Sequence, residues 1–382
     1  MSQIAAGRGS DERLPGGSHI ARSSADQFVD DGLALLERGE VDRALAYFDK
    51  ALGHDSRSAR AFCGRALVWR HRGDPAAALR EYDTAIELKP DFGAALFNRA
   101  LIHFESGDFN QAIGDLNRAM QLLPIEARQL FLRASCHLEL GAVRQAVSDF
   151  TEGLRLNPDD PCAYFQRGVA HARGSRFEDA LSDFETAISR GLKTAQAYAW
   201  RGYALSLLGQ PEKADVSFGE AMRLDEANAK LYVLRGLALH SSGGFEGAIR
   251  DYDQAIRLAP NALSSYCYRS ITWAALGRDD LAMRDCEHAL AQDAGCADAY
   301  FARGVLWSKL GEFDNAINDL SRSLELGRND AQAYFLRGNA WMAKNERANA
   351  LADFGKAQDL EPDRFPIDEA LGTDGNGTVT MS

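Results

Sequence analysis

A 34-residue period runs through most of this 382-residue chain, and it constrains the fold more than any other feature. From Ala25 to Arg364 the chain divides without insertion into ten repeats of 34 residues. The repeats begin at Ala25, Ala59, Gly93, Ala127, Pro161, Ala195, Ala229, Leu263, Ala297 and Ala331. Position 20 of every repeat is alanine. A fixed period of this length is typical of stacked arrays, in which each repeat needs only its neighbours for support.

Each repeat is predicted to be a pair of helices joined by a short break. Position 8 is always a small residue and position 24 is usually aromatic, as in Gly236 and Tyr252. A small residue opposite a large ring lets two helices approach closely and interlock. Position 15 is glycine in eight repeats, which is typical of the left-handed residue that ends a helix.

The pattern resembles the tetratricopeptide repeat in its 34-residue form. That resemblance implies an all-α solenoid, a right-handed superhelix of antiparallel helix pairs whose first helices form the inner, concave wall. Ten repeats would make somewhat more than one superhelical turn. We therefore expect a disordered lead over residues 1–24, the solenoid over residues 25–364, and a mostly disordered tail over residues 365–382, with one helical turn at Ile367–Leu371.

Composition and net charge limit where the protein can be located in the cell and which kinds of partner it can bind. The chain is 46% hydrophobic and 26% charged, its longest apolar run is far short of a membrane span, and its first residues lack a signal-peptide core. We expect a cytoplasmic protein that does not contact a membrane. The formal charge of −12 opposes broad binding to nucleic-acid phosphates.

Position 7 is arginine in nine consecutive repeats, and position 23 is acidic in eight of these nine. The first repeat lacks both, so we infer that the two charges pair between the first helix and a second helix. The arginines with such a partner are Arg65, Arg99, Arg133, Arg167, Arg235, Arg269, Arg303 and Arg337. The acids are Glu81, Asp115, Asp149, Asp183, Asp251, Asp285, Asp319 and Asp353. The sequence leaves open whether the partner lies in the same repeat or the next, and a structural role is favoured over an electrostatic stripe that reads a ligand.

Repeat six departs from this rule. Ser217 replaces the acid, and Asp215 stands where the other repeats have an apolar residue. We expect Arg201 to turn to Asp215, or the array to be looser over residues 209–219.

Neither a metal site nor an active site is predicted. His103, His137 and His171 recur at one position, but packed helices lie too far apart for one ion to reach three of them. The six cysteines show no metal-like spacing, so small buried thiols are favoured. Phosphate-loop and zinc-protease motifs are absent from the sequence. We expect a non-enzymatic protein without cofactor or metal.

By the resemblance, positions 2, 5, 6, 9, 12 and 13 of the first helices face the concave groove, and the candidate residues come from positions 5, 6 and 9. Apolar residues prevail there, while the lysine that the family's chaperone-binding carboxylate clamp needs at position 5 is missing. The candidate peptide-binding residues are Phe97, Asn98, Phe131, Leu132, Phe165, Trp200, Tyr203, Tyr268, Phe301 and Phe335. Large aromatic side chains are frequent energetic anchors of interfaces. The alternative is that the phenylalanines at position 5 pack against the adjoining helix.

The sequence therefore predicts a scaffold that binds an unknown peptide or protein segment in its groove. The alternative is a structural solenoid that assembles into oligomers through its ends or its groove.

Overall fold

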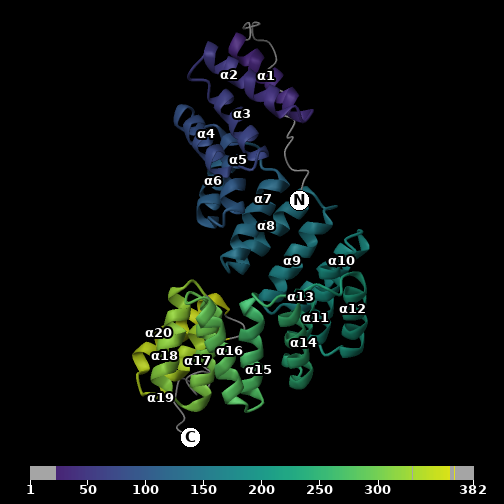
Figure 1. The fold of residues 1–382 in the computed structure, drawn as a ribbon, viewed down its shortest axis with the longest axis vertical. Helices are drawn as coiled ribbons and strands as arrows, with labels where there is room; N and C mark the ends of the chain where they lie inside the picture. Colours follow the sequence, from purple (N-terminus) through teal and green to yellow (C-terminus); the bar gives the residue numbers. More distant parts are fainter. Residues whose placement is uncertain (1–22, 329, 362–364, 366–382) are drawn as a thin grey trace. The chain divides into compact units, whose positions relative to one another are not determined.

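The computed structural model describes residues 23–328, 330–361 and 365, and these residues form twenty α-helices (Figure 1). They belong to two compact units, Met1–Glu139 (unit 1) and Leu140–Ser382 (unit 2), each of which is described by itself. The prediction of an all-α solenoid is confirmed, whereas the number of superhelical turns stays a prediction. The expected lead, except its last two residues, and the expected turn at residues 367–371 lie outside the described residues.

Unit 1 contains three complete repeats and the first helix of the fourth. The first helices are α1 (Ser24–Glu37), α3 (Ala59–His71), α5 (Gly93–Glu105) and α7 (Ala127–Glu139). The second helices are α2 (Val41–His54), α4 (Pro75–Leu88) and α6 (Phe109–Leu122).

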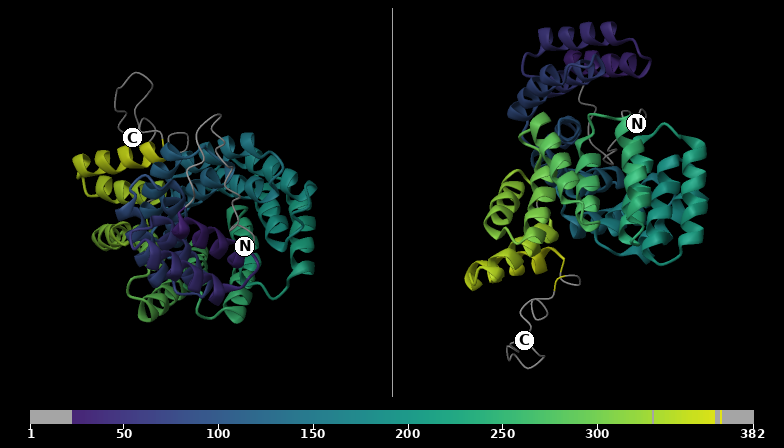
Figure 2. Two further views of the ribbon diagram at one scale, coloured as in Figure 1. Left: turned by 90° about the horizontal axis from the view of Figure 1, so that it is seen from above. Right: turned by 60° about the horizontal axis from the view of Figure 1, so that its bottom comes forward.

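Unit 2 contains the remaining helices. The second helices are α8 (Val143–Leu156), α10 (Phe177–Ser189), α12 (Pro211–Leu224), α14 (Phe245–Leu258), α16 (Asp279–Gln292), α18 (Phe313–Glu325) and α20 (Arg347–Leu360). The first helices are α9 (Pro161–Arg173), α11 (Ala195–Leu207), α13 (Ala229–Ser241), α15 (Leu263–Ala275), α17 (Ala297–Leu310) and α19 (Ala331–Ala343). Within each unit, neighbouring helices run antiparallel and side by side (Figure 2).

The small residue at position 8 packs under the large residue at position 24, as its sequence pattern predicts. In repeat seven, a Cβ added to Gly236 would lie 2.6 Å from Cε1 of Tyr252, whose side chain is buried. Gly168 and Gly338 lie equally close to the rings of Phe184 and Phe354. Glycine is needed at these three positions because the two helices approach closely there.

The break between the helices of a repeat requires a left-handed residue at position 15. All eight glycines at this position have φ between 69° and 82°. The two exceptions, Ser175 (φ 59°) and Asn345 (φ 61°), adopt the same conformation despite their side chains. Asparagine tolerates it better than serine, so repeat five carries the most strained break.

The arginine at position 7 joins three helices. Arg99 donates from Nε and Nη2 to both carboxylate oxygens of Asp115, at 2.7 Å each, and Nη1 donates to Asp83 of the preceding repeat at 2.7 Å. Asp115 lies 16 residues after the arginine and Asp83 lies 16 residues before it. The arginine therefore pairs within its own repeat and also reaches back to position 25 of the previous one.

The same pairing, in which Nε and Nη2 of the arginine both donate to one carboxylate, occurs in six further repeats. It joins Arg65 to Glu81, Arg167 to Asp183, Arg235 to Asp251, Arg269 to Asp285, Arg303 to Asp319 and Arg337 to Asp353. Arg133 and Asp149 belong to different units, so their pairing stays a prediction. The guanidinium groups of these six arginines also lie over the aromatic ring at position 4, as Arg235 does over Tyr232 at 5.8 Å, whereas Arg99 has Leu96 at that position. The hydrogen bonds to Asp251 are the main cause of the raised pKa of Arg235.

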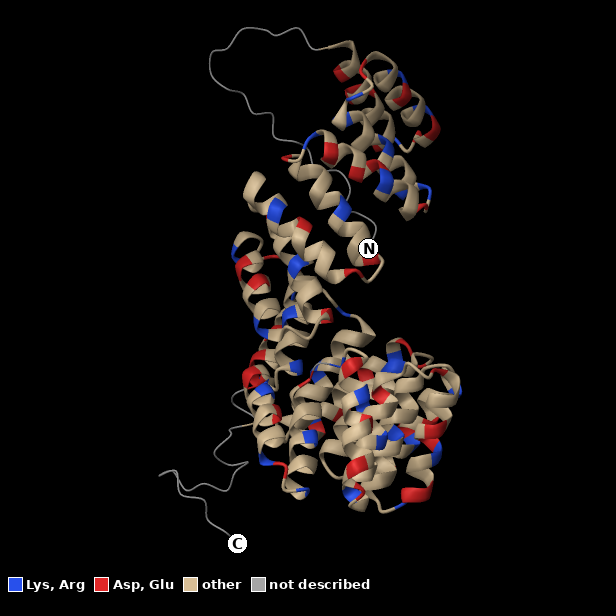
Figure 3. Cartoon of the chain, turned by 90° about the vertical axis from the view of Figure 1, so that its left-hand side faces the viewer, with Lys and Arg blue, Asp and Glu red and all other residues tan. Residues whose placement is uncertain are grey.

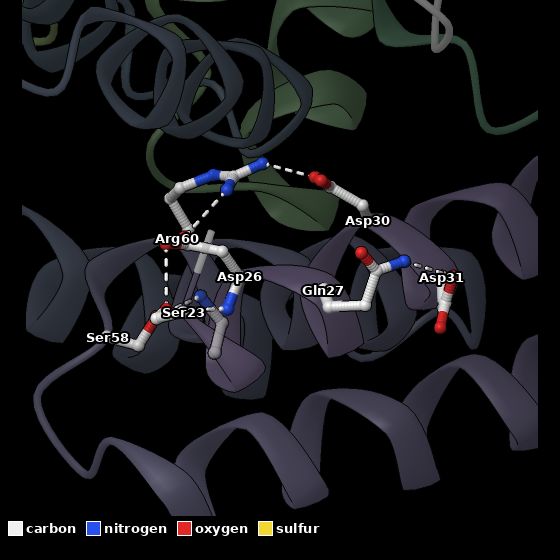
Figure 4. A network of polar contacts seen from close by, with 8 residues as sticks. Ser23, Asp26, Gln27, Asp30, Asp31, Ser58 and Arg60 are labelled. Carbon is white, nitrogen blue, oxygen red and sulfur yellow. Dashed lines mark hydrogen bonds and ion pairs between the residues drawn. The ribbon is translucent and has the colours of Figure 1, made fainter. Parts of the chain in front are cut away.

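The first repeat, which has no such arginine, is tied to the second by surface charges. Arg60 on α3 bridges Asp26 and Asp30 on α1, at 2.8 and 2.6 Å (Figure 4). Ser23 caps α1 by accepting a hydrogen bond from the backbone N–H of Asp26. Basic and acidic residues are also interspersed along the other helices (Figure 3).

Replacing Ser175 with glycine is expected to raise the free energy of unfolding by about 0.5–1 kcal/mol, because the left-handed conformation costs serine about 1–2 kcal/mol and glycine only chain entropy. Denaturant unfolding followed by circular dichroism measures this. The matched control, Gly243→Ser at the same position of repeat seven, should lower stability. A Ser175→Gly protein no more stable than the wild type would contradict the strain at this break.

Replacing Asp251 with alanine is expected to lower the free energy of unfolding by about 2–3 kcal/mol. Removing the buried carboxylate leaves Arg235 without this partner, but the arginine side chain is one-third exposed, so the loss lies at or below the lower limit of the about 3–5 kcal/mol known for buried pairs. The control is Ser217→Ala, which removes only one neutral acceptor at the same position and should cost about 1 kcal/mol. If Asp251→Ala unfolds at the wild-type midpoint, the pair does not stabilise the repeat.

Candidate protein-binding surface

Phe97 does not line an exposed groove. Its side chain is 6% exposed and packs in the core of unit 1, with the half-buried Leu132 against the same core. The guanidinium of Arg128, on the next first helix, lies 4.9 Å from the centre of the Phe97 ring. The expectation of an exposed anchor is wrong here because α7 covers position 5 of α5. Asn98 and Phe131 are half-buried in the same unit.

Phe301, in unit 2, is also covered by an arginine side chain. It is 3% exposed, and the Arg328 guanidinium lies 3.8 Å from the ring centre. Arg328 is held there by Asp298 and by Asp330, whose carboxylate is 2.7 Å from its Nε. Phe301 is therefore a core residue and is removed from the candidate surface.

The remaining aromatic candidates of repeats five and six form one cluster on α9, α10 and α11. The ring of Phe165 lies 5.8 Å from the buried Phe184, which lies 6.2 Å from Trp200. Trp200 contacts Tyr203 at 5.8 Å, and Tyr203 contacts Phe177 at 6.1 Å. Phe165, Trp200 and Tyr203 are half-buried, so part of each side chain stays accessible. We call these three residues the aromatic cluster.

Two further candidates are half-buried elsewhere in unit 2. Tyr268 on α15 stacks on the buried Tyr252 with 6.1 Å between ring centres, and burial raises the pKa of Tyr268. Phe335 on α19 lies 5.5 Å from the buried Phe354 and 4.9 Å from Phe365. Phe365 belongs to the segment that we expected to be a mostly disordered tail, and it covers part of Phe335.

Sequence reasoning missed three contributors. Phe177 supports Tyr203, and its signal is the phenylalanine that recurs at position 17 as Phe109, Phe177, Phe245 and Phe313. Arg328 gives no such signal, since other repeats often have proline at that position. The polar residue at position 25 was also missed, although its side chain accepts from the arginine in several repeats.

In the described part of the chain, no three side chains of His, Cys, Asp and Glu gather around one point as metal ligands would. The expectation of six buried thiols is wrong for two of them, because Cys162 is exposed and Cys296 is half-buried. A hydrogen bond with Cys267 lowers the pKa of Cys296 to about 7. None of the helices in the described residues is long and apolar enough to span a membrane.

Comparison with known structures gives helical-repeat proteins. PilF of Pseudomonas aeruginosa is 22% identical over 55% of this chain and 96% of its own, with a TM-score of 0.49. A tetratricopeptide repeat protein of Parabacteroides merdae is 20% identical over 65% of this chain and 98% of its own, with a TM-score of 0.49. Yeast Tom70 is 17% identical over 88% of this chain and 85% of its own, with a TM-score of 0.47. These similarities carry no argument about a shared activity.

No curated protein matches the sequence. The family comparison is decisive, because models of the tetratricopeptide repeat match residues 29–91, 72–127, 97–161, 131–188, 165–229, 229–262 and 301–364. These matches span more than half of the chain and follow the helix pairs described above. The chain therefore belongs to the tetratricopeptide repeat family, whose members act as scaffolds for protein interaction.

Proposed function

We propose that the protein is a non-enzymatic cytoplasmic scaffold that binds a peptide or protein segment at the aromatic cluster of repeats five and six. The observation that carries this proposal is the accessibility of three large aromatic side chains on two adjacent first helices. Phe97 and Phe301 occupy the position of Phe165 in other repeats, and each is covered by an arginine from a neighbouring segment. The cluster keeps part of its apolar surface open to a partner.

The chemistry of the cluster favours a partner with an apolar anchor. Tyrosine and tryptophan supply much contact area and lose little side-chain entropy on binding. Trp200 packs against Phe184, and Tyr203 packs against Phe177, so both rings are positioned before a partner binds. The excess of acidic residues in the chain disfavours nucleic acid as the partner.

Peptides selected on the full-length protein from a random display library should carry a large apolar residue. The double variant Trp200→Ala/Tyr203→Ala should bind them at least about tenfold more weakly, since central aromatic anchors are worth about 2 kcal/mol or more. Fluorescence anisotropy with labelled peptides measures the affinities.

Two controls accompany this test. Leu156→Ala removes an apolar side chain that is 50% exposed on a second helix, and it should leave binding unchanged. Trp200→Phe keeps a ring over Phe184 and separates loss of binding from loss of packing. The proposed site is wrong if the folded double variant binds the selected peptides as tightly as the wild type does.

The alternative function, self-assembly, has its own support. Leucines at position 30, the end of the second helices, expose more than a third of their surface in unit 2, namely Leu156, Leu224 and Leu258. Arg190 occupies this position in repeat five, between Leu156 and Leu224. Exposed apolar side chains can join copies of a protein. Light scattering over a range of concentrations distinguishes the two functions, because a constant monomer mass favours the scaffold and a rising mass favours assembly.

A further inference from the structure

Repeat six has an arginine whose carboxylate partner is missing. Nε of Arg201 donates to Oγ of Ser217 at 3.1 Å, and that hydroxyl donates in turn to the backbone carbonyl of Lys213 at 2.9 Å. Arg201 makes no ion pair with any residue that the structure describes. In the paired repeats both Nε and Nη2 of the arginine donate to the acid. In repeat six Nε donates to Ser217, and Nη2 has no carboxylate oxygen to bind among the described residues.

The expected substitute does not fill this place. Asp215 is exposed on α12 and acts electrostatically on Arg235 of the next repeat, where it adds to the raised pKa of that arginine. The expectation that Arg201 turns to Asp215 is therefore wrong.

A cleft lies beside the guanidinium of Arg201. A cleft of about 480 Å³ is bounded by α10, α11 and α12, and both Arg201 and Ser217 line it. Leu181, Leu205 and Val216 supply apolar walls. Serine is shorter than aspartate, so this substitution both removes a charge and opens room next to the guanidinium. A volume of this order is within the range of small-ligand sites.

The guanidinium is held in place without its acid. Its carbon lies 5.2 Å from the centre of the Tyr198 ring, the same stacking that Arg235 and Arg269 make with the ring at position 4 of their own repeats. One hydrogen bond to Ser217 fixes the orientation of the fork. A planar guanidinium positioned in this way matches a carboxylate, which accepts two parallel hydrogen bonds.

We propose that this cleft binds a carboxylate, which takes the place of the aspartate that repeat six lacks. The charged head bonds Arg201, and the aliphatic part of the ligand lies against Leu181 and Val216. An acidic side chain of a protein partner and a small free carboxylic acid both have this chemistry. The site is distinct from the aromatic cluster and does not depend on it.

Glu185 is the internal competitor for Arg201. It lines the cleft and lies 16 residues before the arginine, the spacing at which Asp83 and Asp253 bond their arginines. Glu185 makes no hydrogen bond to Arg201 in the structure, yet its charge opposes an incoming anion. Removing that charge with Glu185→Gln should strengthen carboxylate binding. Two further charges line the cleft, Glu212 and Lys213, and they oppose each other; Lys213 donates a hydrogen bond to Gln210 at 2.8 Å.

Isothermal titration calorimetry on the full chain tests the proposal with two probes. One probe is succinate, and the other is a blocked five-residue peptide with a central glutamate between glycine and serine residues. We expect the wild type to bind at least one of them. Binding by both indicates general carboxylate recognition, binding by the peptide alone an acidic protein segment, and binding by succinate alone a small acid.

Ser217→Asp is the decisive variant because it restores the internal partner that other repeats have. It should fold at least as stably as the wild type and bind the probe at least about tenfold more weakly, as expected for loss of hydrogen bonds to a charged group. Arg201→Gln should lose binding to the same extent. The proposal is overturned if neither probe binds the wild type, if Ser217→Asp binds as tightly, or if the peptide with glutamine in place of glutamate binds equally well.

Discussion

The bidentate pairing of an arginine with an acid 16 residues later is the interaction on which the stacking of this chain depends. The arginine leaves the first helix, crosses to the second helix of its own repeat, and in several repeats reaches the second helix before it, as Arg269 does with Asp285 and Asp253. One side chain thereby fixes the register of three helices. Where position 4 is aromatic, stacking over its ring orients the guanidinium. Because the aspartates are buried, loss of the arginine would leave an unpaired charge in the core, whereas loss of the aspartate leaves a partly exposed guanidinium.

This interaction explains why repeat six is the most informative place in the chain. The packing residues there are ordinary, since Gly202 still lies under Phe218 and Ala214 is still buried. Only the carboxylate is missing. The consequence is local: an arginine with half of its hydrogen bonds and a cleft beside it, on the side of the second helices. The aromatic cluster of the same region lies on the first helices. Repeats five and six thus offer two chemically different surfaces.

Much of this architecture could be predicted from the sequence because each feature recurs ten times. The place of a residue in the 34-residue repeat is enough to predict the helix pairs, the small residue under the large ring and the break at position 15. The left-handed backbone at Ser175 shows how strongly the repeat imposes its geometry, since serine adopts it without the freedom of glycine.

The candidate binding residues were harder to predict because their exposure depends on side chains that do not recur. Phe97 and Phe301 occupy the position of Phe165, yet Arg128 and Arg328 cover them. Arg328 lies in a loop where other repeats often have proline, so no periodic pattern points to it. The acceptor at position 25 varies among Asp, Asn, Thr and Ser, which hid its role.

In this account, the arginine–acid pair determines how stably the two helices of each repeat pack against each other. Native-state hydrogen exchange of backbone amides measures this for each helix separately. The account predicts that amides in α12, whose repeat lacks the pair, exchange faster than those in α10 and α14, whose repeats have it. Equal protection of the three helices, or slowest exchange in α12, would contradict it.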